Sequence, residues 1–214
     1  MHPGFSCRPL QETDRNDPVV MAIKTLMSYA AFGGAFFSDR RTTGSIVPSS
    51  PFLGRRMARA VPTGEAGLIV ELGVGTGAIT KSLFDHGIDP QNLVSVDCSE
   101  EMVDWTQKRF PQANVKLGDA TKLGELLDSD HALQEQDVAH IVSSLPFKSL
   151  SKEVGHGIVD EAHRVLPKDG RFVQFTYDLR PSACPIVGRR FDLVDSSIVW
   201  FNVPPARVNI YSPI

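Results

Sequence analysis

Three carboxylates stand where apolar segments end, so that a fold could gather them around one ligand. Glu71 lies in a segment that leads into a glycine-rich turn, residues 73–78, which reads Gly-Val-Gly-Thr-Gly-Ala. Asp97 and Asp119 end the next two apolar segments. Glycines leave the backbone bare, so a ligand can approach it closely, and a carboxylate placed like Asp97 can accept both hydroxyls of a ribose. The spacing therefore indicates a ligand that contains a nucleoside.

The charge of this region separates two classes of nucleoside ligand. The pattern Gly73-x-Gly75-x-x-Ala78 also fits the fingerprint of dinucleotide-binding proteins, in which the turn holds a pyrophosphate. Here, however, three acids and no basic residue surround the turn. This arrangement suits a cationic sulfonium with an amino-acid tail, and it suits phosphates poorly.

A second group of residues follows the apolar segment 137–143. Pro146 cannot donate to a sheet ladder, so a strand must stop before it, and the loop 144–147 reads Ser-Leu-Pro-Phe. Tyr177 ends a later apolar segment. We expect the hydroxyls of Ser144 and Tyr177 to orient a second ligand, and the apolar residues between 145 and 147 to exclude water from it. His140 lies inside the strand, and we expect it to be structural.

The elements that position these residues alternate between strands and helices. Strands are expected at 68–72, 93–97, 115–117, 137–143 and 171–177, and helices at 77–85, 99–109, 122–127 and 151–165. Such alternation is typical of βαβ units in a mostly parallel sheet. The last two expected strands, 197–201 and 207–211, are too close for a crossover helix and must be antiparallel. The predicted fold is α/β, a Rossmann-like doubly wound sheet with a C-terminal antiparallel hairpin, and ligands should bind beyond the carboxyl ends of its parallel strands.

The N-terminal segment has a different character. Residues 19–37 are nearly apolar, but Lys24 and the Gly33-Gly34 pair argue against a membrane span, and the apolar residues recur at a helical period. We expect an amphipathic helix that either packs on the domain or lies in a membrane interface. The predicted organisation is a tail and amphipathic helix over residues 1–38, followed by one domain over residues 39–214.

Charge and cysteine content narrow the class of protein further. The 214 residues carry a net charge of −3, which does not indicate a nucleic-acid binder, yet residues 1–60 alone carry +4. A basic segment of this kind favours an anionic partner. Three widely spaced cysteines without a Cys-x-x-Cys pair favour a reduced, cytoplasmic compartment and argue against a metal site. Residues 1–17 are polar and do not form a secretory signal.

Several segments resemble those of a known enzyme family. The segments ELGVGTGAIT, VSVDCSEEM and LGDAT are similar to those of class I S-adenosylmethionine-dependent methyltransferases. A narrower resemblance, to the bacterial phospholipid N-methyltransferases, rests on TGSIVPSS (43–50), VSSLPF (142–147), RFVQFTYDLRP (171–181) and IVWFNVPPARVNIY (198–211). Members of that family methylate phosphatidylethanolamine stepwise towards phosphatidylcholine.

The resemblance implies that Glu71, Gly73, Gly75 and Asp97 contact the cofactor and that the N-terminal helix docks on anionic lipid, while the positions of the other residues suggest their roles. S-adenosylmethionine would be the cofactor, and its expected contacts are Glu71, Gly73, Gly75, Thr76, Gly77, Asp97, Asp119, Ala120 and Ser143. Ser144 and Tyr177 are the candidate catalytic residues. The expected substrate-binding residues are Leu145, Pro146, Phe147 and Arg207. Arg207 would bind a phosphate and residues 43–50 would close over the site. Residues 19–41 would dock on an anionic membrane surface, which implies a peripheral association with the inner membrane.

Because the sequence departs from the family pattern at two places, other substrates remain as alternatives. His140 replaces an apolar residue, and FFSDRR stands where a Trp-bearing stretch is expected. The main alternative is an enzyme like the rRNA adenine methyltransferases, whose corresponding loop resembles Asn-Leu-Pro-Tyr. Ser144 lacks the planar amide of that Asn, although Phe147 could still stack on a base. A methyltransferase of another amino lipid or small amine, and a cofactor-binding scaffold without activity, are the remaining alternatives.

Overall fold

The computed structural model describes residues 49–130, 137–180 and 184–214. Several expectations concern residues outside these ranges: the amphipathic helix, the boundary between residues 38 and 39, the membrane contact of residues 19–41, and nearly all of the segment 43–50. Within the described residues, no helix is long and apolar enough to cross a membrane.

The described residues form a seven-stranded sheet with the order β3-β2-β1-β4-β5-β7-β6. Its strands are β1 (Leu68–Leu72), β2 (Leu93–Asp97), β3 (Asn114–Leu117), β4 (Val138–Ser143), β5 (Arg171–Thr176), β6 (Phe191–Val199) and β7 (Ala206–Pro213). The first five strands run parallel to one another, and β7 lies antiparallel between β5 and β6. The predicted fold class, including the C-terminal antiparallel hairpin, is confirmed.

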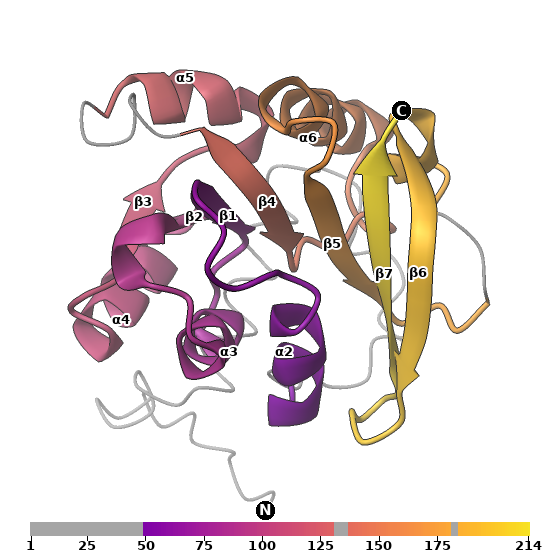
Figure 1. Cartoon of the computed structure of the whole chain (residues 1–214), viewed down its shortest axis with the longest axis horizontal. Helices are drawn as coiled ribbons and strands as arrows, with labels where there is room; N and C mark the ends of the chain where they lie inside the picture. Colours follow the sequence, from indigo (N-terminus) through magenta and orange to yellow (C-terminus); the bar gives the residue numbers. More distant parts are fainter. Residues whose placement is uncertain (1–48, 131–136, 181–183) are drawn as a thin grey trace, which may run out of the picture.

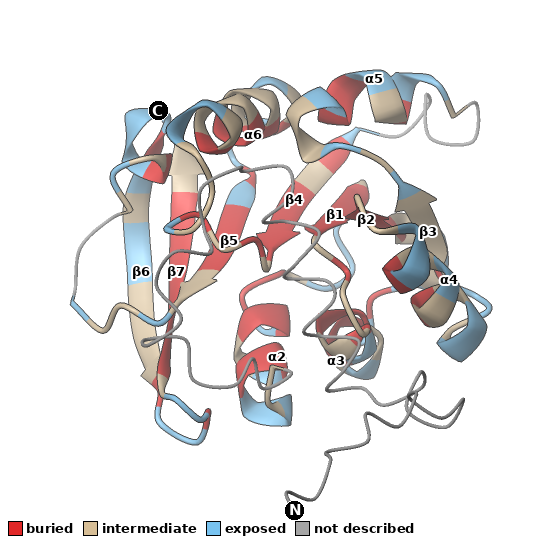
Figure 2. Ribbon diagram, turned by 180° about the vertical axis from the view of Figure 1, so that it is seen from behind, coloured by how far each residue is buried: buried red, intermediate tan, exposed pale blue. Residues whose placement is uncertain are grey.

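Helices cover both faces of this sheet (Figure 1), with α2, α3 and α4 on one face and α5 and α6 on the other. The described helices are α2 (Pro51–Ala58), α3 (Ala78–His86), α4 (Glu100–Arg109), α5 (Leu123–Asp128) and α6 (Lys152–Val165), with short 3-10 turns at Pro90–Asn92, Ala120–Lys122 and Val187–Arg189. Two apolar cores lie between sheet and helices, one on each face. Figure 2 shows the strands of the middle of the sheet as the most buried part of the fold.

The structure differs from the expected elements mainly at their ends. Three helices begin one residue later than expected, because Gly77, Ser99 and Ser151 are N-cap residues with non-helical backbone. Helix α2 was not expected, although Ser50 accepts a hydrogen bond from the Leu53 amide and Pro51 occupies the first turn, which together are a helix-start signal.

The C-terminal hairpin also differs from its expected bounds. Strand β6 begins at Phe191 and not at residue 197, and a register shift between Leu193 and Asp195 interrupts its alternation. Trp200 and Phe201 lie in the turn after β6 and not within the strand. These two residues are therefore part of the hairpin tip.

Candidate active site

The glycine-rich turn after β1 has the backbone that its sequence requires. Gly73, Gly75 and Gly77 have φ angles of 81°, 50° and 76°, a region that residues with side chains rarely adopt. A Cβ at Gly77 would lie 2.7 Å from the Phe110 ring, whereas a Cβ at Gly75 would meet nothing within 4 Å. Gly77 is thus also needed for packing, while Gly75 leaves open space above the turn.

Asp97 ties this turn to the end of β2. Its Oδ2 accepts a hydrogen bond of 2.9 Å from the Gly75 amide, and its Oδ1 accepts one of 2.9 Å from the Ser99 amide. The carboxylate is buried. The turn and the second predicted acid are therefore brought together as the sequence predicts.

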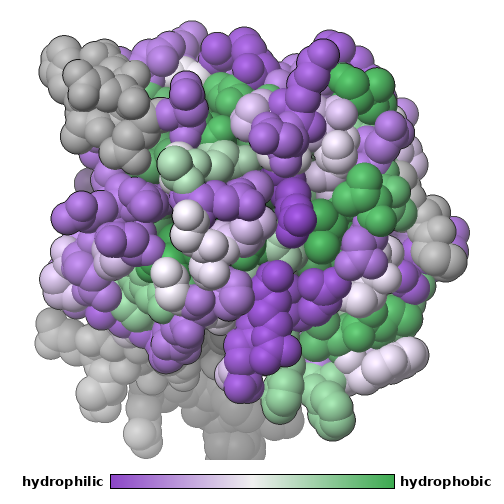
Figure 3. All heavy atoms as spheres, viewed as in Figure 1, coloured by the Kyte–Doolittle hydropathy of each residue, from purple (hydrophilic) through white to green (hydrophobic). Residues whose placement is uncertain are grey.

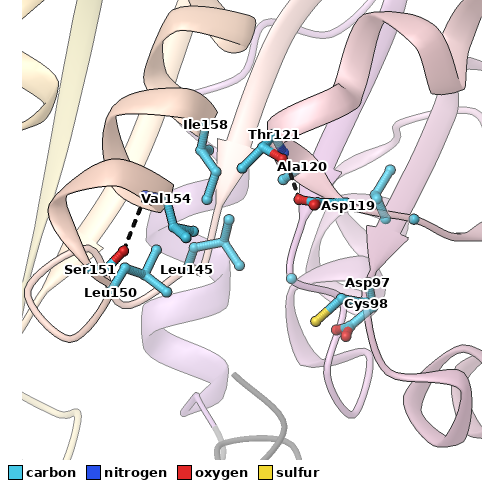
Figure 4. Close-up of a pocket in the computed structure, with 13 residues that line it drawn as sticks. Asp97, Cys98, Asp119, Ala120, Thr121, Leu145, Leu150, Ser151, Val154 and Ile158 are labelled. Atoms are coloured by element: carbon cyan, nitrogen blue, oxygen red, sulfur yellow. Dashed lines mark hydrogen bonds between the residues drawn. The ribbon is translucent and has the colours of Figure 1, made fainter. Parts of the chain in front are cut away.

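A pocket opens between the turn and helix α6, and we call it the turn pocket (Figure 4). Its wall contains Gly73, Val96, Asp97, Cys98, Gly118, Asp119, Ala120, Thr121, Leu145, Leu150, Ser151, Val154 and Ile158. Figure 4 shows the polar residues Asp97 and Asp119 on one side, and the apolar side chains of Leu145, Leu150, Val154 and Ile158 on the other.

The third predicted acid, Asp119, lies at this pocket on an exposed turn. Its Oδ1 accepts a hydrogen bond of 2.8 Å from the Thr121 amide. An apolar wall that faces two carboxylates fits an adenosine, because the flat base can pack on aliphatic groups while its ribose hydroxyls and amino group donate to oxygen. The residues present therefore fit the adenosine end of the predicted cofactor.

Glu71 lies behind the turn and does not line the turn pocket. Its Oε2 accepts hydrogen bonds from the Thr80 hydroxyl (2.7 Å) and the Ser95 hydroxyl (2.6 Å), while its buried Oε1 has no partner among the described residues. Burial raises the pKa of Glu71 to about 7, and the two hydroxyl hydrogen bonds oppose that rise. The predicted direct cofactor contact stays a prediction, and the unpartnered oxygen is the atom that could make it.

A second cavity, which we call the loop cavity, has a volume of about 530 Å³ and lies beside the loop after β4. It is lined by Leu145, Pro146, Phe147, Lys148, Ser149, Gln174, Phe175, Thr176, Tyr177, Asp178, Arg180, Cys184, Asn209 and Tyr211. Leu145 lines both this cavity and the turn pocket. The structure thus brings Tyr177 and residues 145–147 together at one cavity, as the sequence predicts.

The two serines at the end of β4 have structural partners. Ser143 is buried, its Oγ accepts from the Leu145 amide (3.3 Å), and it does not line the turn pocket, in contrast to the expected cofactor contact. Ser144 donates its hydroxyl proton to the carbonyl oxygen of Gly73. Ser144 therefore joins the loop to the glycine-rich turn, and its predicted catalytic role stays a prediction.

Arg207 was expected to bind a phosphate of the substrate, but it does not line the loop cavity. Its guanidinium is buried and donates to the Leu179 carbonyl (3.1 and 2.7 Å) and to the Ser196 hydroxyl (2.7 Å). Arg207 therefore holds the segment after β5 against the hairpin. Lys148 and Arg180, which the sequence reasoning did not select, are the cations that line the loop cavity.

Gly75, Thr76, Gly77 and His140 also line neither cavity, so the expected cofactor contacts of the first three stay predictions. Thr76 does not line the turn pocket, and its carbonyl accepts a 2.9 Å hydrogen bond from Arg109. His140 lies well inside β4, where its Nδ1 accepts from the Arg171 amide (3.1 Å), so that the Nε2 proton is donated to Glu65 at 2.9 Å. His140 is structural, as expected.

Gln174 lines the loop cavity but is not among the candidates expected from the sequence. It is buried, its Nε2 donates to the carbonyls of Leu145 (2.9 Å) and Phe175 (2.8 Å), and its Oε1 has no partner among the described residues. A single amide within the apolar strand sequence RFVQFT was the available signal, because an amide in such a strand requires hydrogen-bond partners.

The chain is similar in sequence to known methyltransferases. A model of the family described as "Methyltransferase domain" matches residues 69–170. The ornithine lipid N-methyltransferase of Singulisphaera acidiphila is 31% identical over 185 residues, which cover 85% of this chain and 94% of that protein.

Two solved structures share the fold. The TehB-like S-adenosylmethionine-dependent methyltransferase from Corynebacterium glutamicum has a TM-score of 0.57 at 19% identity, covering 91% of this chain and 99% of that chain. The N-methyltransferase NodS from Bradyrhizobium japonicum, solved with S-adenosyl-L-homocysteine, has a TM-score of 0.57 at 14% identity, covering 92% and 99%.

The fold, the turn pocket and these similarities define a class I S-adenosylmethionine-dependent methyltransferase. The chain belongs to this family and is related to the lipid N-methyltransferases. The predicted family, enzyme class and cofactor are confirmed.

Proposed function

We propose that this methyltransferase transfers a methyl group to the amine of an amino lipid, and that an ethanolamine phospholipid, methylated towards phosphatidylcholine, is its substrate. The loop cavity is the observation that carries this proposal. It adjoins the turn pocket across a single residue, Leu145, and its volume of about 530 Å³ suits a lipid headgroup. S-adenosylmethionine supplies a methyl group that a positively charged sulfur makes electrophilic.

The charges that line the loop cavity favour a headgroup with an anion. Lys148 and Arg180 both form ion pairs with Asp178, and the Arg180 pair measures 2.7 Å. Hydrogen bonds from these two cations hold the pKa of Asp178 well below its usual range. Two cations share one carboxylate, so a positive charge remains for the phosphate of an ethanolamine headgroup. These two residues take the role that the sequence assigned to Arg207.

The interior of the loop cavity offers neutral oxygens to the amine. Gln174 and Tyr177 both line this cavity, and the buried Oε1 of Gln174 has no partner among the described residues. Burial raises the pKa of Tyr177 above its ordinary value near 10, so its hydroxyl stays protonated at neutral pH. Tyr177 therefore orients the amine through its oxygen, and the amine loses its proton to water.

A lipid substrate requires access to a membrane. We propose that the protein is cytoplasmic and binds peripherally to an anionic membrane surface through residues 19–41, which lie outside the described residues. The excess positive charge of residues 1–60 supports this arrangement, because basic segments are attracted to anionic lipids.

An ornithine lipid is the second candidate substrate, favoured by the 31% identical relative that carries this lipid in its name. An ornithine headgroup bears an amine and a carboxylate, and an ethanolamine headgroup bears an amine and a phosphate. Both match a cavity with neutral oxygens inside and surplus positive charge at Lys148 and Arg180.

Expression in a bacterial host that makes ethanolamine phospholipid, but neither choline phospholipid nor ornithine lipid, tests the proposal. Mass spectrometry of extracted lipids should show ethanolamine phospholipid with added methyl groups. A host that makes ornithine lipid provides the second arm. If neither host contains a methylated amino lipid although the purified protein binds S-adenosylmethionine, the proposed substrate class is wrong.

A further inference from the structure

The tip of the β6–β7 hairpin, residues 200–203, presents large apolar side chains to solvent. Trp200, Phe201 and Val203 are 65%, 76% and 72% exposed. Phe52 of helix α2 is also exposed and packs against Phe201, with ring centroids 5.3 Å apart. A cluster of exposed large apolar residues of this kind marks an interaction surface.

The tip is held in place by its one buried residue. Asn202 is 3% exposed, its Oδ1 accepts from the Ser50 amide (3.1 Å), and its Nδ2 donates to the Pro204 carbonyl (2.7 Å). Asn202 thus fixes the tip to the start of α2 while its neighbours face outwards. The apolar exposure is therefore built into the fold.

Helix α2 adds positive charge next to this apolar surface. Residues 49–64 contain three arginines and no acid. Arg55 lies over the Phe52 ring at 5.0 Å, and neither Arg55 nor Arg59 has an ion pair within the described parts of the chain, whereas Arg56 pairs with Asp195. Figure 3 shows apolar residues at the lower right, over the hairpin tip, beside strongly hydrophilic residues over α2.

This surface lies at the same edge of the sheet as the loop cavity. Thr176, the last residue of β5, pairs with Arg207 near the start of β7, so the hairpin tip lies beside the carboxyl end of β5. Tyr177, which lines the loop cavity, is close enough to the Asn202 side chain for that side chain to oppose the rise in the pKa of Tyr177. The C-terminus lies at the opposite end of the hairpin (Figure 1).

From these observations we infer that the hairpin tip and helix α2 form a docking surface for an anionic lipid bilayer. Trp and Phe side chains would enter the headgroup region, and the arginines of α2 would meet anionic headgroups. This inference rests on the proposed function, since an acceptor lipid can reach the loop cavity from the membrane only if this edge faces the membrane. It is distinct from the contact proposed for residues 19–41.

Tryptophan fluorescence tests the docking surface directly. The chain has two tryptophans, Trp105 and Trp200, so a Trp105→Phe variant reports on Trp200 alone. Vesicles of phosphatidylglycerol and phosphatidylcholine should shift its emission to the blue, and brominated lipids should quench it. If Trp105→Phe is unstable, the fluorescence of Trp200 is obtained as the difference between the wild type and Trp200→Phe. Vesicle binding without a change at Trp200 would overturn the inference.

A matched pair of variants measures how much the tip contributes. Phe201→Ser should weaken vesicle binding about tenfold, because a large apolar side chain is lost from the interface. Ile214 is also an exposed apolar residue, at the opposite end of the hairpin, and Ile214→Ser should bind vesicles like the wild type. Equal vesicle binding by the two variants would contradict the inference. So would a wild-type protein that associates with itself through the tip and does not bind vesicles.

Failure of the docking surface can be told apart from failure of the proposed function. Phe201→Ser should methylate a short-chain, monomeric amino lipid like the wild type and lose rate only on vesicles. If no amino lipid is methylated in either form, the proposed function fails, while the response of Trp200 to vesicles still decides whether the tip docks.

Discussion

The side-chain amide of Gln174 donates a hydrogen bond of 2.9 Å to the main-chain oxygen of Leu145. This bond fixes the residue that separates the turn pocket from the loop cavity, since Leu145 lines both. The residue that lines both cavities is therefore held by β5, a neighbouring strand, and not only by the loop itself.

Replacing Gln174 should disturb the acceptor site more than the cofactor site. Gln174→Met keeps the side-chain length but leaves the Leu145 carbonyl without its donor, and kcat/KM for the acceptor should fall about tenfold. Gln107→Met is the matched control, because Gln107 also donates to a carbonyl (3.1 Å, Pro111) but lies on α4. Steady-state kinetics on vesicles measures both. Equal losses in the two variants would show that Gln174 acts only through stability.

Replacing Gly75 should weaken cofactor binding as well as strain the backbone. Gly75 and Gly87 both have positive φ, and a Cβ at either would meet nothing within 4 Å. Gly75→Ala and Gly87→Ala should each lower the free energy of unfolding by about 1–2 kcal/mol. Isothermal titration should show weaker binding of S-adenosylmethionine for Gly75→Ala alone. If both variants bind the cofactor like the wild type, the turn does not approach the ligand.

Glu71 should make stability depend on pH. Its pKa is raised from about 4.5 to about 7 by burial, so the folded protein holds this proton more tightly than the unfolded chain. The resulting stabilisation is complete below pH 4.5 and is lost as the pH rises through 7, a change of about 3 kcal/mol. Urea unfolding between pH 5 and 8 should show this decline for the wild type and not for Glu71→Gln. A constant difference between the two proteins at every pH would contradict the assignment.

Tyr177 and Ser144 should behave differently when altered. Tyr177→Phe removes a hydroxyl from the loop cavity, so methyl transfer should slow about tenfold while cofactor affinity stays nearly unchanged. Ser144→Ala removes the hydrogen bond to the Gly73 carbonyl, so both methyl transfer and cofactor affinity should fall. Titration calorimetry and a methyl-transfer assay distinguish the two. Full activity of Tyr177→Phe would exclude its role in orienting the amine.

The sequence predicts the central strands and the position of Asp97, but only Gly73, Asp97, Asp119 and Ala120 of the expected cofactor contacts line the turn pocket. Strands β1 and β2 have the predicted bounds, because each is a fully buried and mostly apolar run next to glycine or a polar turn. Asp97 accepts hydrogen bonds from the amides of Gly75 and Ser99. All three residues lie within one βαβ unit, so local spacing brings them together.

The acceptor side depends on residues that are distant in sequence. Gln174 meets Leu145 across 29 positions, and Lys148 meets Asp178 across 30. Arg207 is turned towards Leu179 and Ser196 by the register of β7. Such contacts follow from strand pairing, which local residue patterns do not specify.

Methyl transfer by the purified protein tests the central claim most directly. The protein would be incubated with S-adenosylmethionine labelled in its methyl group and with phosphatidylglycerol vesicles that contain phosphatidylethanolamine, ornithine lipid or no amino lipid, and separately with ribosomal RNA. Label should enter an amino lipid, with phosphatidylethanolamine as the expected acceptor, and should enter neither RNA nor vesicles without an amine. Label in RNA, or no label in any lipid although the cofactor binds, would contradict the account.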